Sequence, residues 1–156
     1  MALATITDIK VYIDLPNNAR EDDINNRIRE AERFDLRPQI GKEFLEDLQQ
    51  NPGTGSNATA IDELKPALCY YAFARHILNA QNHPTQTGFV KKETPYSNPV
   101  SLKELQAKAS DNRAIAFGYL EDFIDYIEKN RQSFPLYNGK GNYSKVGSKI
   151  AQSKKT

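Results

Sequence analysis

Few residues in this chain have the type and spacing that chemistry requires. The two histidines, His76 and His83, lie seven residues apart with no Cys, Asp or Glu between them. Metalloprotease helices instead place two histidines around a glutamate within one turn, and zinc sites need three or four such ligands. We expect no metal site, with His76 on a helix and His83, which precedes Pro84, in a turn.

Cys69 is the only cysteine and lies in the apolar segment 67–72, so it has no partner for an intramolecular disulfide. Nothing near it in sequence marks it as a nucleophile, although a base brought close in space, such as His76, would activate it. The apolar neighbours predict a buried, reduced thiol.

Other patterns fit structural roles better than chemical ones. The glycine pairs at 53–55 and 139–141 lack the remaining residues of a Walker loop or a dinucleotide-binding turn. Aromatic residues between 70 and 73 point in different directions on a helix, which predicts packing rather than base stacking. Carboxylates can act in acid–base pairs or bind cations, but solvated helix faces better explain Glu43, Glu46, Asp47, Glu121, Asp122 and Asp125. The sequence predicts no enzymatic activity, no catalytic residue and no cofactor.

The composition predicts one folded domain. The 156 residues are 38% hydrophobic and 26% charged, which is enough apolar content for a single core. No apolar run approaches the length of about 18 residues that a membrane span needs, and the N-terminus does not look like a signal peptide. We expect a protein made in the cytoplasm, with no membrane partner.

Helical periodicity dominates the first 80 residues. Apolar positions recur every three or four residues from 22 to 31. Pro38 disfavours helical geometry at Arg37, and Gly41 permits a break, after which a short apolar face follows. The pattern recurs from 59 to 80, where Pro66 can kink the first turns. Residues 7–13 fit either a strand or a short helix capped by Thr7.

Ser101 and Glu104 have the spacing of a capping box, so a helix is expected to begin at Ser101. Its apolar stripe continues to about residue 133, which gives about 30 residues and roughly 45 Å. A compact domain of this size is about 39 Å across. The helix is therefore predicted to overhang its domain, unless it bends near 111–112 or at Gly118.

The stretch 84–100 contains three prolines and a glycine, which is typical of an extended arm or an irregular hairpin. An arm of that length that exposes apolar groups is predicted to contact another protein. The residues assigned to this contact are Phe89, Val90, Lys91, Lys92 and Tyr96.

Charge is unevenly distributed along the chain. Residues 1–128 carry 14 basic against 20 acidic side chains, a net charge of −6, and all seven ionic side chains after Glu128 are basic. Residues 138–156 are polar and glycine-rich, which predicts a disordered basic tail after a folded domain at 1–137. Docking of the tail on a partner is favoured over a solvated terminus or DNA contact, through Tyr143, Lys145, Val146, Lys149 and Ile150.

Together these patterns predict an all-α fold. We expect a small helical bundle with one long C-terminal helix, an arm or irregular hairpin at 84–100, and a flexible basic tail.

The order of short motifs resembles the head-tail connector family of tailed bacteriophages. Segment 7–13 followed by the acidic helix start at 21–24 is similar to the N-terminal half of those connectors. Segments 34–48, 87–90, 96–97 and 134–137 are similar to connector-like proteins of phages and prophages of Bacteroidetes. The resemblance covers about residues 5–137. The long arm and the basic tail depart from the pattern of the connectors, so the resemblance implies no role for either of them.

This resemblance implies a structural adaptor in the virion neck. Such a subunit forms a cyclic homo-oligomer, twelve-membered if it matches the portal, between the portal protein and the next neck or tail protein. DNA passes through the channel without specific recognition. A stopper or tail-completion protein is the alternative, and a small DNA-binding regulator is less favoured because the folded part is acidic.

Removal of residues 138–156 is predicted to leave helix content and ring formation intact but to weaken attachment of the next neck component. Circular dichroism and electron microscopy of virion necks measure both effects. Tailed, infectious particles at normal yield after this truncation would rule out the docking role.

Overall fold

The computed structural model describes residues 2–15, 19–79, 82–85, 88–91 and 101–139, and the side chains of 82–91 are left out of the description. The all-α prediction is confirmed: a small helical bundle ends in one long helix. The helices are α1 (Ile6–Tyr12), α2 (Glu21–Ala31), a π-helical turn η1 (Glu32–Leu36), α3 (Arg37–Ile40), α4 (Lys42–Gln50), α5 (Asn57–Asn79), α6 (Leu102–Lys129) and a 3-10 turn η2 (Arg131–Ser133).

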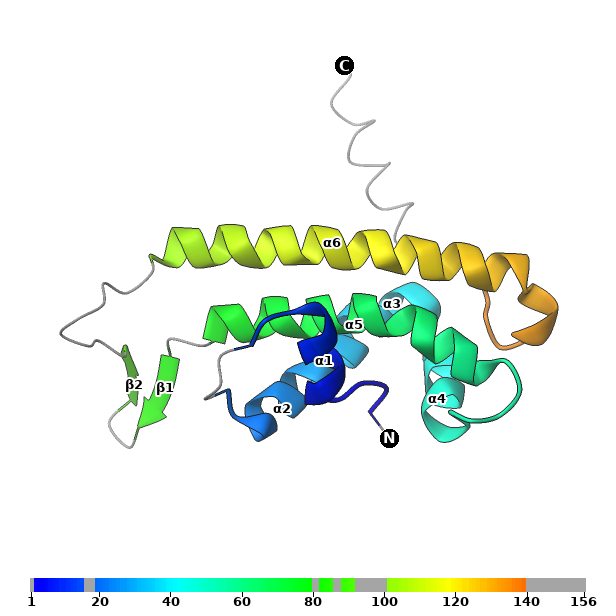
Figure 1. Cartoon of the computed structure of the whole chain (residues 1–156), viewed down its shortest axis with the longest axis horizontal. Coiled ribbons are helices and arrows are strands. Elements are labelled where there is room, and N and C mark those ends of the chain that lie inside the picture. Colours follow the sequence, from blue (N-terminus) through cyan, green and yellow to red (C-terminus); the bar gives the residue numbers. More distant parts are fainter. Residues whose placement is uncertain (1, 16–18, 80–81, 86–87, 92–100, 140–156) are drawn as a thin grey trace, which may run out of the picture.

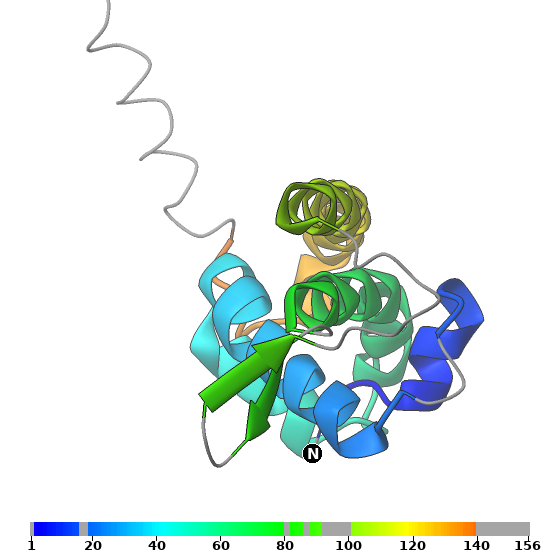
Figure 2. The ribbon, with the colours of Figure 1, turned by 90° about the vertical axis from the view of Figure 1, so that its left-hand side faces the viewer.

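The bundle is built around α5. Helices α5 and α6 run side by side in opposite directions, and α1, α2 and η1 pack on the part of α5 that α6 leaves open (Figures 1 and 2). Because α5 is covered on several sides, apolar side chains occur around most of its circumference rather than in one stripe. Those buried include Ile61, Leu64, Leu68, Tyr71, Ala72 and Ile77, as predicted, whereas Leu78 is only half-buried.

Residues Ile6–Tyr12 form a helix, so the strand alternative is wrong. The N-cap is Thr5 rather than Thr7: its hydroxyl accepts from the Asp8 backbone N–H at 3.3 Å, and the Asp8 carboxylate accepts from the Thr5 N–H at 2.8 Å. Ile9 is fully buried while Val11 is 73% exposed. In a strand, Ile9 and Val11 would face the same side. In a helix they point in different directions, so Ile9 can lie in the core while Val11 is exposed.

The break expected before Pro38 is also wrong. Arg37 is helical, with φ −52° and ψ −40°, and the chain runs from α2 through η1 into α3 without interruption. Pro38 lies in the first turn of α3, just after the π-helical turn, where a missing N–H costs little. The break comes at Gly41, whose φ of 89° glycine adopts without strain.

The capping box at Ser101 is confirmed. The Ser101 hydroxyl accepts from the Glu104 N–H at 3.2 Å, and the Glu104 carboxylate accepts from the Ser101 N–H at 2.9 Å. The helix contains 28 residues, and η2 follows it after Asn130. The overhang predicted for this helix is wrong beyond its first turn, because Ala109 packs near the end of α5 and the domain is as elongated as the helix (Figure 1).

The predicted arm begins as a hairpin. Strands β1 (Asn82–Thr85) and β2 (Gly88–Lys91) pair antiparallel, with Asn82 opposite Lys91 and Thr85 opposite Gly88. The hairpin lies beyond the C-terminal end of α5 (Figure 1). Residues 92–100 of the arm lie outside the described residues.

An aromatic cluster ties the end of the described chain to α4. The Phe44 ring lies 6.4 Å from Phe123, 5.7 Å from Phe134 and 5.6 Å from Tyr137, measured between centroids. All four rings are buried. The core therefore extends to Tyr137, past the last helical turn.

Replacement of Phe44 by alanine should lower the free energy of unfolding by about 3–5 kcal/mol, because it leaves a cavity among three rings. Phe34→Ala is the matched control: Phe34 is 57% exposed, so its loss should cost no more than about 1 kcal/mol. Urea unfolding followed by circular dichroism measures both. Equal losses would show that the aromatic cluster is not part of the cooperative core.

Candidate protein-interaction surface

Three tyrosines from three helices form one surface, which we call the aromatic face. Tyr70 of α5 stacks on Tyr119 of α6, with ring centroids 5.7 Å apart and planes 15° from parallel. The Tyr70 hydroxyl donates to the backbone carbonyl of Tyr12 at 3.4 Å. Tyr12 and Tyr119 are each 38% exposed. Stacked, partly exposed tyrosines supply rigid apolar area for a partner.

The aromatic face depends on the seating of α1. Lys65 of α5 lies 3.6 Å from Asp8 and 3.1 Å from Asp62, and Asp8 also completes the capping box at Thr5. The capping box and Lys65 hold the pKa of Asp8 below its ordinary value against the opposing effect of burial, which is the largest single influence. The carboxylate is therefore charged at neutral pH and keeps Lys65 between α1 and α5.

Two exposed carboxylates lie beside the aromatic face, one on α6 and one on α5. Asp122 follows Tyr119 by three residues and Glu63 precedes Tyr70 by seven, so each lies on the same side of its helix as the tyrosine. Both side chains are exposed, as is Asp62. The aromatic face consequently has an acidic rim.

A second surface, the arginine face, lies on α2, η1, α3 and α4. Arg29, Arg33 and Arg37 recur every four residues along the continuous helix, and Lys42 follows from α4. These four side chains border a small cavity of about 160 Å³. Among the described residues, none of the three arginines has a carboxylate within 4.0 Å.

Glu32 lies beneath the arginine face and is 95% buried, with 5% of its surface exposed. One carboxylate oxygen accepts from the Leu3 backbone N–H at 2.6 Å, and the other accepts from the Gln49 amide at 3.0 Å. Burial raises the pKa of Glu32, and the bonds from Leu3 and Gln49 and the nearby Arg29 oppose that shift. Glu32 thus joins the N-terminal segment to η1 and α4.

Phe34 extends the arginine face toward α5. The guanidinium groups of Arg33 and Arg75 lie 5.6 Å and 5.5 Å from the centre of its ring. Arg75 also makes a bidentate ion pair with Asp35: its Nε donates to Oδ2 at 2.7 Å and its Nη2 donates to Oδ1 at 3.0 Å. The ring and the ion pair fix the π-helical turn, which would otherwise be a weak point of the helix.

The two faces lie on different sides of the molecule. Figure 2 shows α1 on one side of α5 and α3 on the other. The aromatic face belongs to the α1 side, and Arg33 and Arg37 belong to the η1–α3 side. One subunit can therefore contact two neighbours at once.

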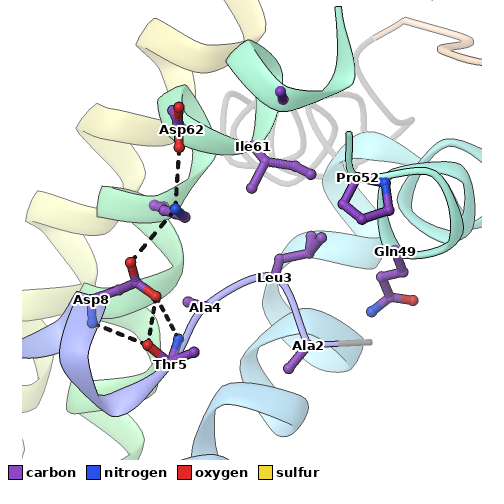
Figure 3. Close-up of a pocket in the computed structure, with 11 residues that line it drawn as sticks. Ala2, Leu3, Ala4, Thr5, Asp8, Gln49, Pro52, Ile61 and Asp62 are labelled. Carbon is purple, nitrogen blue, oxygen red and sulfur yellow. Dashed lines mark hydrogen bonds and ion pairs between the residues drawn. The ribbon is translucent and has the colours of Figure 1, made fainter. Parts of the chain in front are cut away.

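A shallow cavity of about 280 Å³ lies between the N-terminal segment and α5 (Figure 3). Its walls are mainly apolar, from Leu3, Ala4 and Ile61, and Asp8 and Asp62 stand at one edge. The polar groups at that edge already bond with Thr5 and Lys65. The cavity suits an apolar side chain better than a polar ligand.

Cys69 is buried and free, as predicted. Burial raises the pKa of its thiol to about 12, so almost no thiolate forms at neutral pH. His76 is half-buried beside Phe73, and burial lowers the pKa of its imidazole. His83 lies in β1 rather than in a turn. In the part of the chain that the structure describes, no group of three His, Cys, Asp or Glu side chains could hold a metal ion, and no helix is long and apolar enough to cross a membrane.

The acidic residues considered for chemistry lie on helix surfaces. Glu43, Glu46, Glu121, Asp122 and Asp125 are exposed. Asp47 is half-buried and accepts from Asn51 at 2.7 Å and from Asn57 at 3.0 Å, which closes the loop between α4 and α5.

The interface residues predicted from sequence are not tested by the structure. Phe89, Val90 and Lys91 belong to β2, whose side chains are not described, and Lys92 and Tyr96 lie outside the described residues. All the tail residues named above lie outside them as well.

Residues 36–146 match a family of unknown function (DUF6712). The chain belongs to this family. Comparison with curated proteins and with solved structures found no match. The part shared with DUF6712 contains α3 to α6 and therefore Tyr70, Tyr119 and Arg37, whereas α1, α2 and most of η1 precede it. Each candidate face thus combines residues from the segment that matches the family with residues that precede that segment.

Replacement of Glu32 by glutamine tests the buried carboxylate of this DUF6712 member. Because the folded-state pKa lies above the ordinary value of 4.5, the stability linked to the protonated form is present below 4.5 and is lost as pH rises through the folded pKa. The unfolding free energy of the wild type, relative to Glu32→Gln, should therefore fall between acid and neutral pH. Urea titrations at several pH values measure the difference.

Glu43→Gln, at an exposed position of α4, corrects for the lost charge alone. A difference between wild type and Glu32→Gln that stays constant with pH would contradict the raised pKa.

Proposed function

We propose that this protein is a structural head-tail connector subunit, which forms a ring beneath the portal in the neck of a tailed bacteriophage. The motif order described above supports the proposal, together with one structural observation: large apolar side chains are exposed on both flanks of α6. Ile115 and Tyr119 lie on one flank and Phe117, 48% exposed, on the other.

The positions follow from helix geometry. Successive residues are turned by about 100°, so Phe117 and Tyr119 lie about 200° apart. The buried Ala116 and Leu120 face α5 between them. A ring subunit needs two different interfaces, one for each neighbour, because its contacts run head to tail. Exposed apolar groups on two flanks match that requirement.

In this proposal the hairpin and the tail make additional contacts. The β1–β2 hairpin projects past the end of α5 (Figure 1), where it can reach an adjacent subunit or the portal. The basic tail docks on the next neck or tail protein. The DNA passes through the channel without specific contacts, and the proposal assigns no catalytic residue and no cofactor.

Two other functions remain as alternatives. A stopper or tail-completion protein would use the same surfaces but would not contact the portal. A small DNA-binding regulator is less favoured, because the acidic part of the chain repels phosphate.

Co-expression with the portal protein of the same genome tests the proposal. The two proteins should co-purify, and electron cryomicroscopy should show a ring of this protein against the portal with matching, twelve-fold symmetry. The apolar side chains that are exposed on the flanks of α6 would become buried between neighbouring subunits, and this burial supplies the binding free energy.

The portal expressed alone is the control, and its images should lack the density of the additional ring. A protein that stays a stable monomer and ignores the portal, or virion necks without a ring of it, would contradict the proposal.

A further inference from the structure

The arginine face and the aromatic face complement each other in charge and in side-chain type. The arginine face presents Arg29, Arg33, Arg37 and Lys42, and the aromatic face presents three tyrosines inside a rim of carboxylates. We propose that the arginine face of one copy docks on the aromatic face of the next copy. This inference rests on the ring proposed above and names the surfaces that would build it.

The arginines are available for such a contact. Arg29 and Arg33 are exposed, and the nearest buried carboxylate, Glu32, already accepts hydrogen bonds from Leu3 and Gln49. Arginine combines a planar, weakly hydrated cation with an apolar stem, so it can stack on a tyrosine and pair with a carboxylate in the same contact. The Phe34 ring between Arg33 and Arg75 shows that this chain already stacks guanidinium groups on an aromatic ring.

The aromatic face offers both kinds of partner. Tyr70 and Tyr119 present stacked rings, and Glu63 and Asp122 stand beside them on the same helices. Tyrosine and arginine are the residue types that contribute most often to the binding energy of protein interfaces. A rim of carboxylates around the rings orients incoming arginines and steers the approach of the two copies.

A second copy fits the arginine face better than a nucleic acid does. Residues 1–128 carry a net charge of −6, so a long phosphate backbone would be repelled by most of the surface that surrounds the four cations. A second copy presents its carboxylates on one rim of limited extent. Helices α1 and α3, which each carry part of one face, lie on different sides of α5 (Figure 2), and the two faces share no residue. The contact is therefore head to tail, and each copy keeps one face open for the next.

Two charge-reversed proteins test this pairing. One carries Arg29→Glu and Arg33→Glu, and the other carries Glu63→Lys and Asp122→Lys. All four positions are exposed, and because the first pair removes the stacking of Arg33 on Phe34 and the attraction of Arg29 to Glu32, the folded fraction is measured for each protein. Each protein alone opposes like charges at the contact and should be monomeric. An equal mixture should associate, because each reversed face meets a complementary face of the other protein.

Sedimentation velocity of the full chain, at high protein concentration and low salt, measures the association. The wild type should form oligomers that dissociate at about 1 M salt, where the Debye length is about 3 Å. Tyr119→Ala should weaken wild-type association by roughly tenfold or more, whereas Leu102→Ala, at the exposed first turn of α6, should not.

Matched controls reverse charges away from both faces. Lys103→Glu with Lys108→Glu and Asp111→Lys with Glu121→Lys make the same changes in net charge at exposed positions of α6, and both proteins should associate like the wild type. Circular dichroism of every variant confirms that it is folded.

The inference is overturned if the wild type and the mixture stay monomeric, if either reversed protein associates like the wild type, or if the controls lose association equally. It is also overturned if duplex DNA binds the wild type and the reversal of Arg29 and Arg33 removes that binding alone. If the charge-reversed proteins still form a ring on the portal, the inference is overturned and the proposed function stands. If the protein self-associates through these charges but does not bind the portal, the inference stands and the proposed function is overturned.

Discussion

Every feature of this molecule depends on the burial of α5. Leu64 and Leu68 are completely buried between α6 and the N-terminal helices, and full burial of each such side chain stabilises the fold by about 1.5–3 kcal/mol. Because α1, α2, η1 and α6 all pack on this one helix, its sides decide where the others can lie. Tyr70 and Arg75 point in different directions from this helix. Tyr70 belongs to the aromatic face, and Arg75 contacts Phe34 and Asp35 beside the arginine face.

The π-helical turn η1 is the second constraint on the surface. A π-helical turn accommodates one more residue than an α-helical turn, so it rotates everything that follows relative to α2. Here the turn keeps Arg29, Arg33 and Arg37 in one row while Leu36 and Ile40 stay fully buried. It also exposes Phe34, which Arg33 and Arg75 then cover with their guanidinium groups. The arginine face is therefore a consequence of helix geometry as well as of composition.

Local signals in the sequence were sufficient for much of the fold, and long-range ones were not. The capping box at Ser101 and the break at Gly41 depend on a few neighbouring residues, and both occur as predicted. The π-helical turn has no local sequence signature, so Pro38 was wrongly taken as a helix breaker. Tyr12 and Tyr70 meet across 58 residues, a distance that periodicity cannot bridge. The sequence does carry one signal of exposed apolar surface, because Ile115, Phe117 and Tyr119 are large apolar residues off the buried stripe of α6.

The electrostatics of Glu32 explain how the subunit tolerates the arginine face. Like charges in a row repel, and the carboxylate beneath them offsets part of that repulsion while it orders the N-terminal segment through Leu3. Glu32 and Glu46, whose carboxylate lies 3.7 Å from Lys42, do not balance four cations, however, and the charge of Glu32 is screened from solvent by the protein around it. The remaining positive potential extends outward from the surface, where it is weakened by salt and strengthened when a partner excludes water. A surface of this kind costs the molecule some stability, and the pairing proposed above would offset that cost by bringing carboxylates of another copy close to the arginines.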